Sequence, residues 1–254
     1  MSGARALLRN ELRLLRRDPV PAAILVGMPL VLMVLLSRAV GGALLLEGKF
    51  VPGSSQTVPG MACVFAGFGV AIAGFAFFRE HGWRTWRRLR AAGLDGRSIA
   101  LAKLGVPAGL LVGQHVVLFA FGWRFLDFAP AGPWIALAFV GAAFVVVVLA
   151  GALAAVALLS TVQQLNAVTN LAAMALGGLG GGFVPVAVLP EWIQPIAPIS
   201  PVYWAMLAYR RIVFEGAGIG DVLAPVAVLL AFAAALAGLA AWRLRLDEPK
   251  RTWG

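Results

Sequence analysis

Side chains able to do covalent chemistry are few and widely spaced in this sequence. The two histidines, His81 and His115, form no H-E-x-x-H zinc pattern, and no serine occupies a G-x-S-x-G turn. The single cysteine, Cys63, excludes an intramolecular disulfide and a cysteine-based zinc or redox cluster. We therefore predict no catalytic, metal or cofactor-binding residues. We expect the functional side chains to bind a partner or to line a pathway through the protein.

Four polar side chains stand in long apolar runs, where such a route could run. Gln114 and His115 are adjacent, and Asn166 and Asn170 are one helical turn apart. Polar groups are costly in hydrocarbon, so they are functional candidates by default. For His115 the alternative is a simple hydrogen bond to a neighbouring helix. The segment "STVQQLNA", 160–167, is either a small second contact with a cytoplasmic partner or a plain connection between helices.

The composition indicates that these residues are carried by a membrane protein. The chain is 61% hydrophobic and 13% charged, whereas a soluble domain has about a quarter of its residues charged. Its mean hydropathy is +0.90. A helix needs about 20 apolar residues to cross the hydrocarbon core. Six runs meet this need with soft edges: 20–40, 58–78, 99–123, 133–159, 163–185 and 221–242.

The basic residues predict the orientation of these six crossings. An even number places both termini on one side, and 16 of the 21 lysines and arginines fall in segments 1–18, 79–103 and 243–254. The positive-inside bias makes that side cytoplasmic, so the basic pI needs no nucleic-acid partner. Within 1–18 apolar residues recur at helical spacing opposite arginines, which predicts an amphipathic helix lying flat at the membrane surface.

The stretch "REHGWRTWRRLR", 79–90, carries five arginines and two tryptophans in the loop between the second and third spans. On a helical wheel Trp83, Trp86 and Leu89 share one side, and Arg84 and Arg88 face away from them. One interpretation is a basic helix at the membrane surface that touches anionic lipid. The other is a docking element in which tryptophan is the buried anchor and arginine steers a partner.

The longer stretch "FREHGWRTWRRLRAAGLDGRSIALAKL" resembles the first cytoplasmic loop of ABC-type efflux permeases of the drug and polysaccharide exporter class, the type V exporters. The residues that match the family pattern are Glu80, Gly82, Leu89, Gly93 and Lys103. Trp83 replaces a residue that is more often small, and the helix is richer in arginine. The resemblance implies a cytoplasmic coupling loop at 79–98. The ATPase-docking residues it implies are Glu80, Trp83, Trp86, Leu89 and Arg90.

A second stretch, 177–218, resembles the same family. Its prolines, Pro190, Pro195, Pro198 and Pro201, exclude one uninterrupted helix, because each lacks an N–H and disfavours helix at the preceding residue. The resemblance implies a re-entrant helical hairpin at 187–214 on the outer side. Its characteristic residues are Pro190, Trp192, Pro195, Pro198 and Tyr203. The preceding "GGLGGG" indicates close helix packing or, alternatively, a hinge.

Taken over nearly the whole chain, the resemblance implies an all-α permease forming one transmembrane domain, 1–254, in a bacterial plasma membrane. It implies a dimer, expected to be a homodimer, with the translocation route between the two copies. The sequence has no G-x-x-x-x-G-K-[ST] loop. We therefore expect two copies of a separate ATPase subunit to hold ATP and Mg²⁺, and this chain to be no enzyme.

The expected cargo is amphipathic or lipid-like, because the apolar runs carry no ring of charge. Two other functions fit parts of the sequence. An ion-coupled secondary transporter usually keeps an acidic residue near mid-membrane, yet every Asp and Glu here lies outside or at the ends of the runs. A scaffold that only recruits a cytoplasmic protein would leave the outer proline-rich segment unexplained.

Overall fold

The structure is a computed structural model that describes residues 2–46, 48, 50–82 and 96–243. These residues are helical, with no β-strand among them. The α-helices are α1 (Ser2–Arg17), α2 (Val20–Leu46), α3 (Ser54–Gly82), α5 (Gly96–Phe125), α6 (Trp134–Leu158), α7 (Val162–Leu179), α8 (Pro201–Glu215) and α9 (Leu223–Arg243). Three short 3-10 helices complete the described chain: η1 (Val186–Val188), η2 (Gln194–Ile199) and η3 (Gly220–Val222).

Within the described residues, five helices are long and apolar enough to cross a membrane. Their apolar stretches are Val20–Leu45, Ser54–Glu80, Ile99–Phe125, Trp134–Leu158 and Gly220–Arg243. A helix satisfies its own backbone polar groups inside hydrocarbon. Pro29, Pro59 and Pro107 lie within α2, α3 and α5, and each leaves one backbone carbonyl to be satisfied by neighbouring groups. Five of the six predicted runs thus meet the requirements of a crossing, and the all-α prediction is confirmed for the described residues.

The sixth predicted run, 163–185, corresponds to α7, which has 18 residues. Its first half carries Gln163, Gln164, Asn166 and Asn170, so it is less apolar than the other five helices. The helix ends at Leu179 and not near 185, because a glycine turn follows in which Gly181 adopts a φ of +81°. The six-crossing arrangement is therefore not established by length and apolarity.

Helices α3 and α6 form the centre of the bundle. Most of each is buried, whereas α2, α5 and α9 are largely exposed. Helix α3 packs against α2, α5, α6, α7 and α8, and α6 packs most extensively against α9. The shared core contains Met61, Phe65, Val140, Phe144 and Ile212. The outer faces of α2, α5 and α9 are therefore available to lipid or to another subunit.

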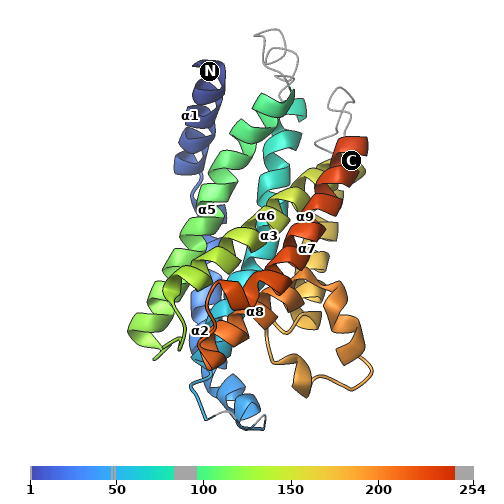
Figure 1. Cartoon of the computed structure of the whole chain (residues 1–254). Coiled ribbons are helices and arrows are strands. Elements are labelled where there is room, and N and C mark those ends of the chain that lie inside the picture. Colours follow the sequence, from blue (N-terminus) through green and yellow to red (C-terminus); the bar gives the residue numbers. More distant parts are fainter. Residues whose placement is uncertain (1, 47, 49, 83–95, 244–254) are drawn as a thin grey trace.

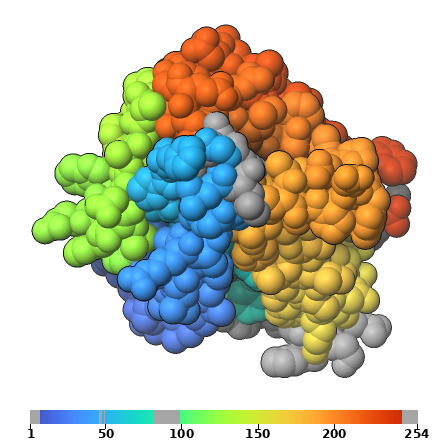
Figure 2. Space-filling model, turned by 90° about the horizontal axis from the view of Figure 1, so that it is seen from below, coloured from blue at the N-terminus to red at the C-terminus, as the bar shows by residue number. Residues whose placement is uncertain are grey.

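The two ends of the bundle differ in what they carry. Figure 1 shows α1, the ends of α3 and α5 that flank 83–95, and the C-terminal end of α9 at one end of the molecule. The turns after α2, α5 and α7 lie at the opposite end, which Figure 2 views directly. Exposed arginines of α1, such as Arg13 and Arg16, lie at the first end. This separation agrees with the charge pattern used to predict the cytoplasmic side.

Helix α1 packs against α5. Leu7 is buried, and the Leu8 side chain lies against Gly105. In the view of Figure 1 the axis of α1 follows the bundle more closely than it crosses its end. The amphipathic helix is thus confirmed, but its flat orientation is not, because side-chain contacts with α5 and α3 hold it beside the spans.

The proline-rich segment is broken, as predicted from its sequence. Two short 3-10 helices, η1 and η2, precede α8. Pro201 occupies the first turn of α8, where its missing N–H costs nothing. The Ser200 hydroxyl accepts a hydrogen bond from the Val202 N–H at 3.1 Å and donates to the Leu176 carbonyl at 2.7 Å. Ser200 therefore caps α8 and ties it to the end of α7. Re-entry into the membrane stays a prediction.

Candidate functional site

A buried cluster of charged side chains joins α1, α3 and α5. Lys103 of α5 has no exposed surface. Its Nζ donates to Glu11 Oε1 at 2.9 Å, to Glu80 Oε1 at 2.8 Å and to the Ala76 carbonyl at 3.0 Å. Arg79 Nη2 also donates a hydrogen bond to Glu11 Oε2. We call Glu11, Arg79, Glu80 and Lys103 the charge cluster.

The charge cluster is balanced, with two carboxylates and two cations. An ammonium group has three donors, and the three contacts of Lys103 use all of them. Glu11 and Glu80 are 5% and 4% exposed, so water replaces a missing partner poorly. Removing one member would leave a buried charge, and such charges are strongly destabilising when unpaired. The cluster therefore fixes the relative positions of three helices.

The position of the charge cluster connects it to the basic loop. Helix α3 ends at Gly82 and α5 begins at Gly96. Glu80 therefore stands just before the loop, and Lys103 stands two helical turns after it. The cluster therefore links the two helix ends that flank the loop to each other and, through Glu11, to helix α1.

Of the predicted docking residues, Glu80 is part of this cluster. Trp83, Trp86, Leu89 and Arg90 lie outside the described residues, so their docking role stays a prediction. The prediction missed Glu11 and Arg79. A lone glutamate among five arginines in 1–18 was the available signal, but solvated charges of opposite sign would produce the same pattern.

A groove of about 380 Å³ extends from the charge cluster toward α7. Glu11 and Arg79 line one part of it, and Asn166 lines another. Asn170 is exposed on the same helix. The two asparagines therefore face away from the core of this chain. In hydrocarbon their amides would lack hydrogen-bond partners, so a second subunit or a water-filled route is the more favourable neighbour.

Gln114 and His115 do not line this groove; they lie in the second half of α5. Gln114 is fully buried, and its amide nitrogen and oxygen have no hydrogen-bond partner among the described residues. His115 is 7% exposed and bonds the Leu111 carbonyl of its own helix through Nδ1. The expected alternative of a bond to a neighbouring helix is therefore not what the structure shows. The four candidate route residues do not form one continuous lining.

The predicted hairpin residues lie at the end opposite the charge cluster. Pro190, Trp192 and Pro195 are exposed, with Trp192 retaining 72% of its surface. The Pro198 carbonyl accepts a hydrogen bond from Trp204 Nε1 at 2.9 Å. Tyr203 is half-buried and meets Trp204 edge to face. The segment thus has an exposed tip around Trp192 and a base, around Pro198 and Tyr203, that is fixed on α8.

Three contacts that the sequence did not predict hold that base against α3. Gln56 is 1% exposed; its Nε2 donates to the Gly181 carbonyl at 2.7 Å, and its Oε1 accepts from Arg210 Nη1 at 2.8 Å. Next to it, Gly60 lies so close to Gly182 that a β-carbon at position 60 would be 2.0 Å from the Gly182 carbonyl oxygen. No local pattern identifies these contacts, because each joins segments more than 100 residues apart.

The long apolar helices define a membrane protein. The buried charge cluster fixes the end of the helical bundle that carries the basic loop. A family model described as ABC-2 type transporter matches residues 3–214. The chain belongs to this family, whose members are membrane-embedded permeases that pair with an ABC ATPase subunit. It is therefore a multi-pass membrane protein, and the resemblance seen in the two local stretches is confirmed at the level of the family.

A similar curated protein is the linearmycin resistance permease protein LnrN of Bacillus subtilis (strain 168). The two sequences are 38% identical over 85 residues, which is 33% of this chain and 22% of the relative. The matched region therefore spans about a fifth of that protein's length.

Proposed function

We propose that this chain is the transmembrane subunit of an ATP-driven exporter that moves an amphipathic small molecule or lipid-like substrate out of the cytoplasm or inner leaflet. A separate ATPase supplies the energy. The observation that carries the proposal is the charge cluster, because it links both ends of the basic loop to α1 through buried ion pairs. Family membership and the resistance permease among its relatives support the same function.

The charge cluster suggests how a push on the loop would reach the membrane. Lys103 binds carboxylates from α1 and α3 at once. Since separating these partners would expose unpaired charges to a dry interior, the three helices move together more easily than apart. The groove beside the cluster reaches Asn166 of α7. A concerted shift of α1, α3 and α5 would therefore change the surroundings of the proposed route.

The proposed assembly contains two copies of this chain and two of the ATPase, which bind ATP and Mg²⁺. The exposed asparagines of α7 face the second copy or the route between the copies. In this arrangement α7 completes six crossings, both termini lie in the cytoplasm of a bacterial inner membrane, and 187–214 enters the outer leaflet as a hairpin.

The arrangement predicts the accessibility of introduced cysteines. In a Cys63→Ala background, position 192 should react with an impermeant thiol reagent in intact cells, whereas positions 88 and 164 should react only after permeabilisation. Trp192 and Gln164 are both exposed in the described structure, so a lack of reaction reports the side of the membrane and not burial. Equal reaction at 164 and 192 in intact cells would contradict a crossing by α7.

The docking role of the loop predicts different effects for its aromatic and basic residues. Trp86→Ala should release the ATPase or uncouple transport, because truncating a buried interface aromatic commonly costs about 2–4 kcal/mol. Arg88→Ala should have a mild effect, since a rim charge contributes less. Co-purification of the ATPase and substrate-stimulated ATP hydrolysis measure both variants. A lipid-binding loop predicts the opposite ranking, because each arginine near anionic lipid contributes about 1 kcal/mol.

A further inference from the structure

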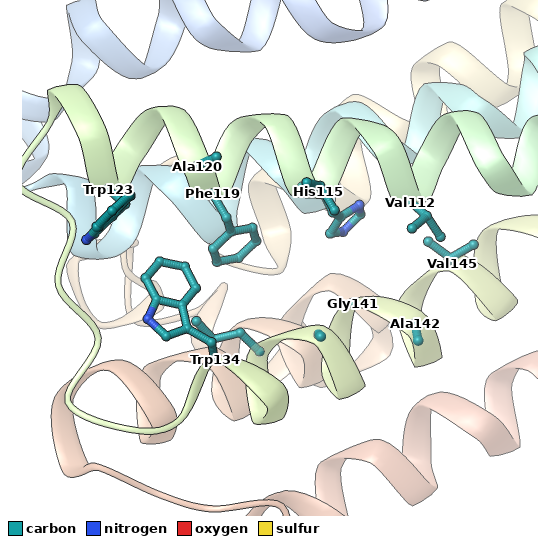
Figure 3. A pocket seen from close by; sticks show the side chains of 12 residues that line it. Val112, His115, Phe119, Ala120, Trp123, Trp134, Gly141, Ala142 and Val145 are labelled. Atoms are coloured by element: carbon teal, nitrogen blue, oxygen red, sulfur yellow. The ribbon is translucent and has the colours of Figure 1, made fainter.

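A cavity of about 540 Å³ lies between α5 and α6, away from the charge cluster. Figure 3 shows its lining side chains, with α5 on one side and α6 on the other. Phe119 and Trp123 come from α5, and Trp134 and Val145 come from α6. The described lining residues include no charged side chain. A volume of this size with apolar walls and few polar groups is typical of small-molecule sites.

Besides the indole N–H groups of Trp123 and Trp134, His115 is the lining side chain with hydrogen-bonding atoms, and its geometry determines what it can bind. Its Nδ1 lies 2.9 Å from the Leu111 carbonyl oxygen. Because a carbonyl only accepts hydrogen bonds, Nδ1 must carry the proton, and in the neutral ring Nε2 is then an acceptor. This Nε2 is buried and has no hydrogen-bond partner among the described residues. Figure 3 shows the ring directed from α5 into the space between the two helices.

A second unsatisfied polar atom lies beside the first. Tyr209 of α8 is fully buried, and its hydroxyl finds no partner within the described chain. A β-carbon at Gly141 would be 3.1 Å from Tyr209 Oη and 3.8 Å from His115 Nε2. Both atoms therefore approach the same glycine. Gly141 and His115 line the cavity, whereas Tyr209 is not itself among the lining residues and reaches it only beside Gly141, which has no side chain. Buried polar groups normally have a partner, so two orphans at one place point to a bound molecule.

We propose that this cavity binds a neutral, lipid-like molecule through a single hydroxyl group. The hydroxyl donates to His115 Nε2 and accepts from Tyr209 Oη, and the apolar body packs along Phe119, Trp123 and Trp134. A hydroxyl is suited to this pair because it is donor and acceptor at once. An ionised head group is disfavoured, since the described lining offers no opposite charge. The molecule is either a bilayer lipid or a transported compound.

The test uses the full chain in lipid nanodiscs, without ATPase, and a 16-carbon alcohol bearing a photoreactive diazirine. We expect this probe to label peptides 112–123 and 134–145. Its methyl ether, which cannot donate, should label them roughly three- to tenfold less, the effect of one neutral hydrogen bond. Unlabelled hexadecanol should compete more strongly than hexadecyl methyl ether on the unaltered protein. Equal labelling or equal competition by alcohol and ether would overturn the proposal.

Matched variants show which side chains bind the hydroxyl group of the probe. His115→Leu and Tyr209→Phe should each reduce labelling by the alcohol to the level of the ether. Tyr203→Phe, which removes the chain's other tyrosine hydroxyl from a half-buried ring that packs against Trp204, should leave labelling unchanged. If His115→Leu and Tyr209→Phe retained full preference for the alcohol, the assigned hydrogen bonds would be wrong.

The two sources of the molecule are separated by adding the ATPase and ATP to the nanodiscs. A resident lipid should stay bound during ATP hydrolysis, whereas a transported compound should be released. Either result keeps the site, because binding is first established without ATPase. Failure of the proposed export would therefore not remove this inference.

Discussion

Lys103→Met is expected to destabilise the protein by about 3–5 kcal/mol, the cost of breaking a buried ion pair by removing one partner. Methionine keeps much of the lysine volume but leaves Glu11 and Glu80 facing each other in a buried place. The apparent unfolding temperature in detergent should fall sharply. Because Lys103 of α5 would no longer hold Glu11 of α1, co-purification of the ATPase should fall as well.

Two further variants distinguish the loss of the pair from the loss of a positive charge. Arg243→Met removes a cation from an exposed side chain at the C-terminal end of α9 and should change stability by no more than about 0.5 kcal/mol. Adding Glu80→Gln to Lys103→Met leaves one carboxylate, Glu11, with one cation, Arg79, and should recover part of the stability. A Lys103→Met protein as stable as the Arg243→Met protein would contradict the buried cluster.

The elements of the fold could be predicted from sequence because the membrane permits few alternatives. A run of about 20 apolar residues must be helical to satisfy its backbone in hydrocarbon, and α2, α3, α5, α6 and α9 follow this rule. The four prolines between 190 and 201 likewise excluded a continuous helix before α8. Helix α7 was harder, since its amides lower its apolarity and a glycine turn ends it at Leu179.

The side chains that hold the helices together were less predictable, because their partners are distant in sequence. Glu11 meets Lys103 across 92 positions, and Gln56 meets Arg210 across 154. Periodicity shows which face of a helix is apolar but not which helix lies opposite. The sequence drew attention to His115 but not to Tyr209 of α8, which lies beside the same glycine. Only the family pattern brought Glu80 and Lys103 to notice.

Gly60→Ala is expected to disturb the opposite end of the molecule. The added β-carbon would lie 2.0 Å from the Gly182 carbonyl oxygen and 2.9 Å from its carbonyl carbon. Both are backbone atoms, so no side-chain rotation relieves the clash. Overpacking of this kind costs about 1–3 kcal/mol and occasionally more. The turn after α7 must move away from α3, which also strains the hydrogen bond from Gln56 to Gly181.

The same change at Gly109 provides the matched control. Gly109 lies within α5, and a β-carbon there would meet nothing within 4 Å. Alanine should stabilise that helix by up to about 1 kcal/mol through its higher helix propensity. Apparent unfolding temperatures of the two variants should therefore shift in opposite directions from the unaltered protein. Since the charge cluster is intact in Gly60→Ala, the ATPase should still co-purify while transport falls. Loss of the ATPase from this variant, with stability unchanged, would show that the α3 contact with the turn does not act as the structure indicates.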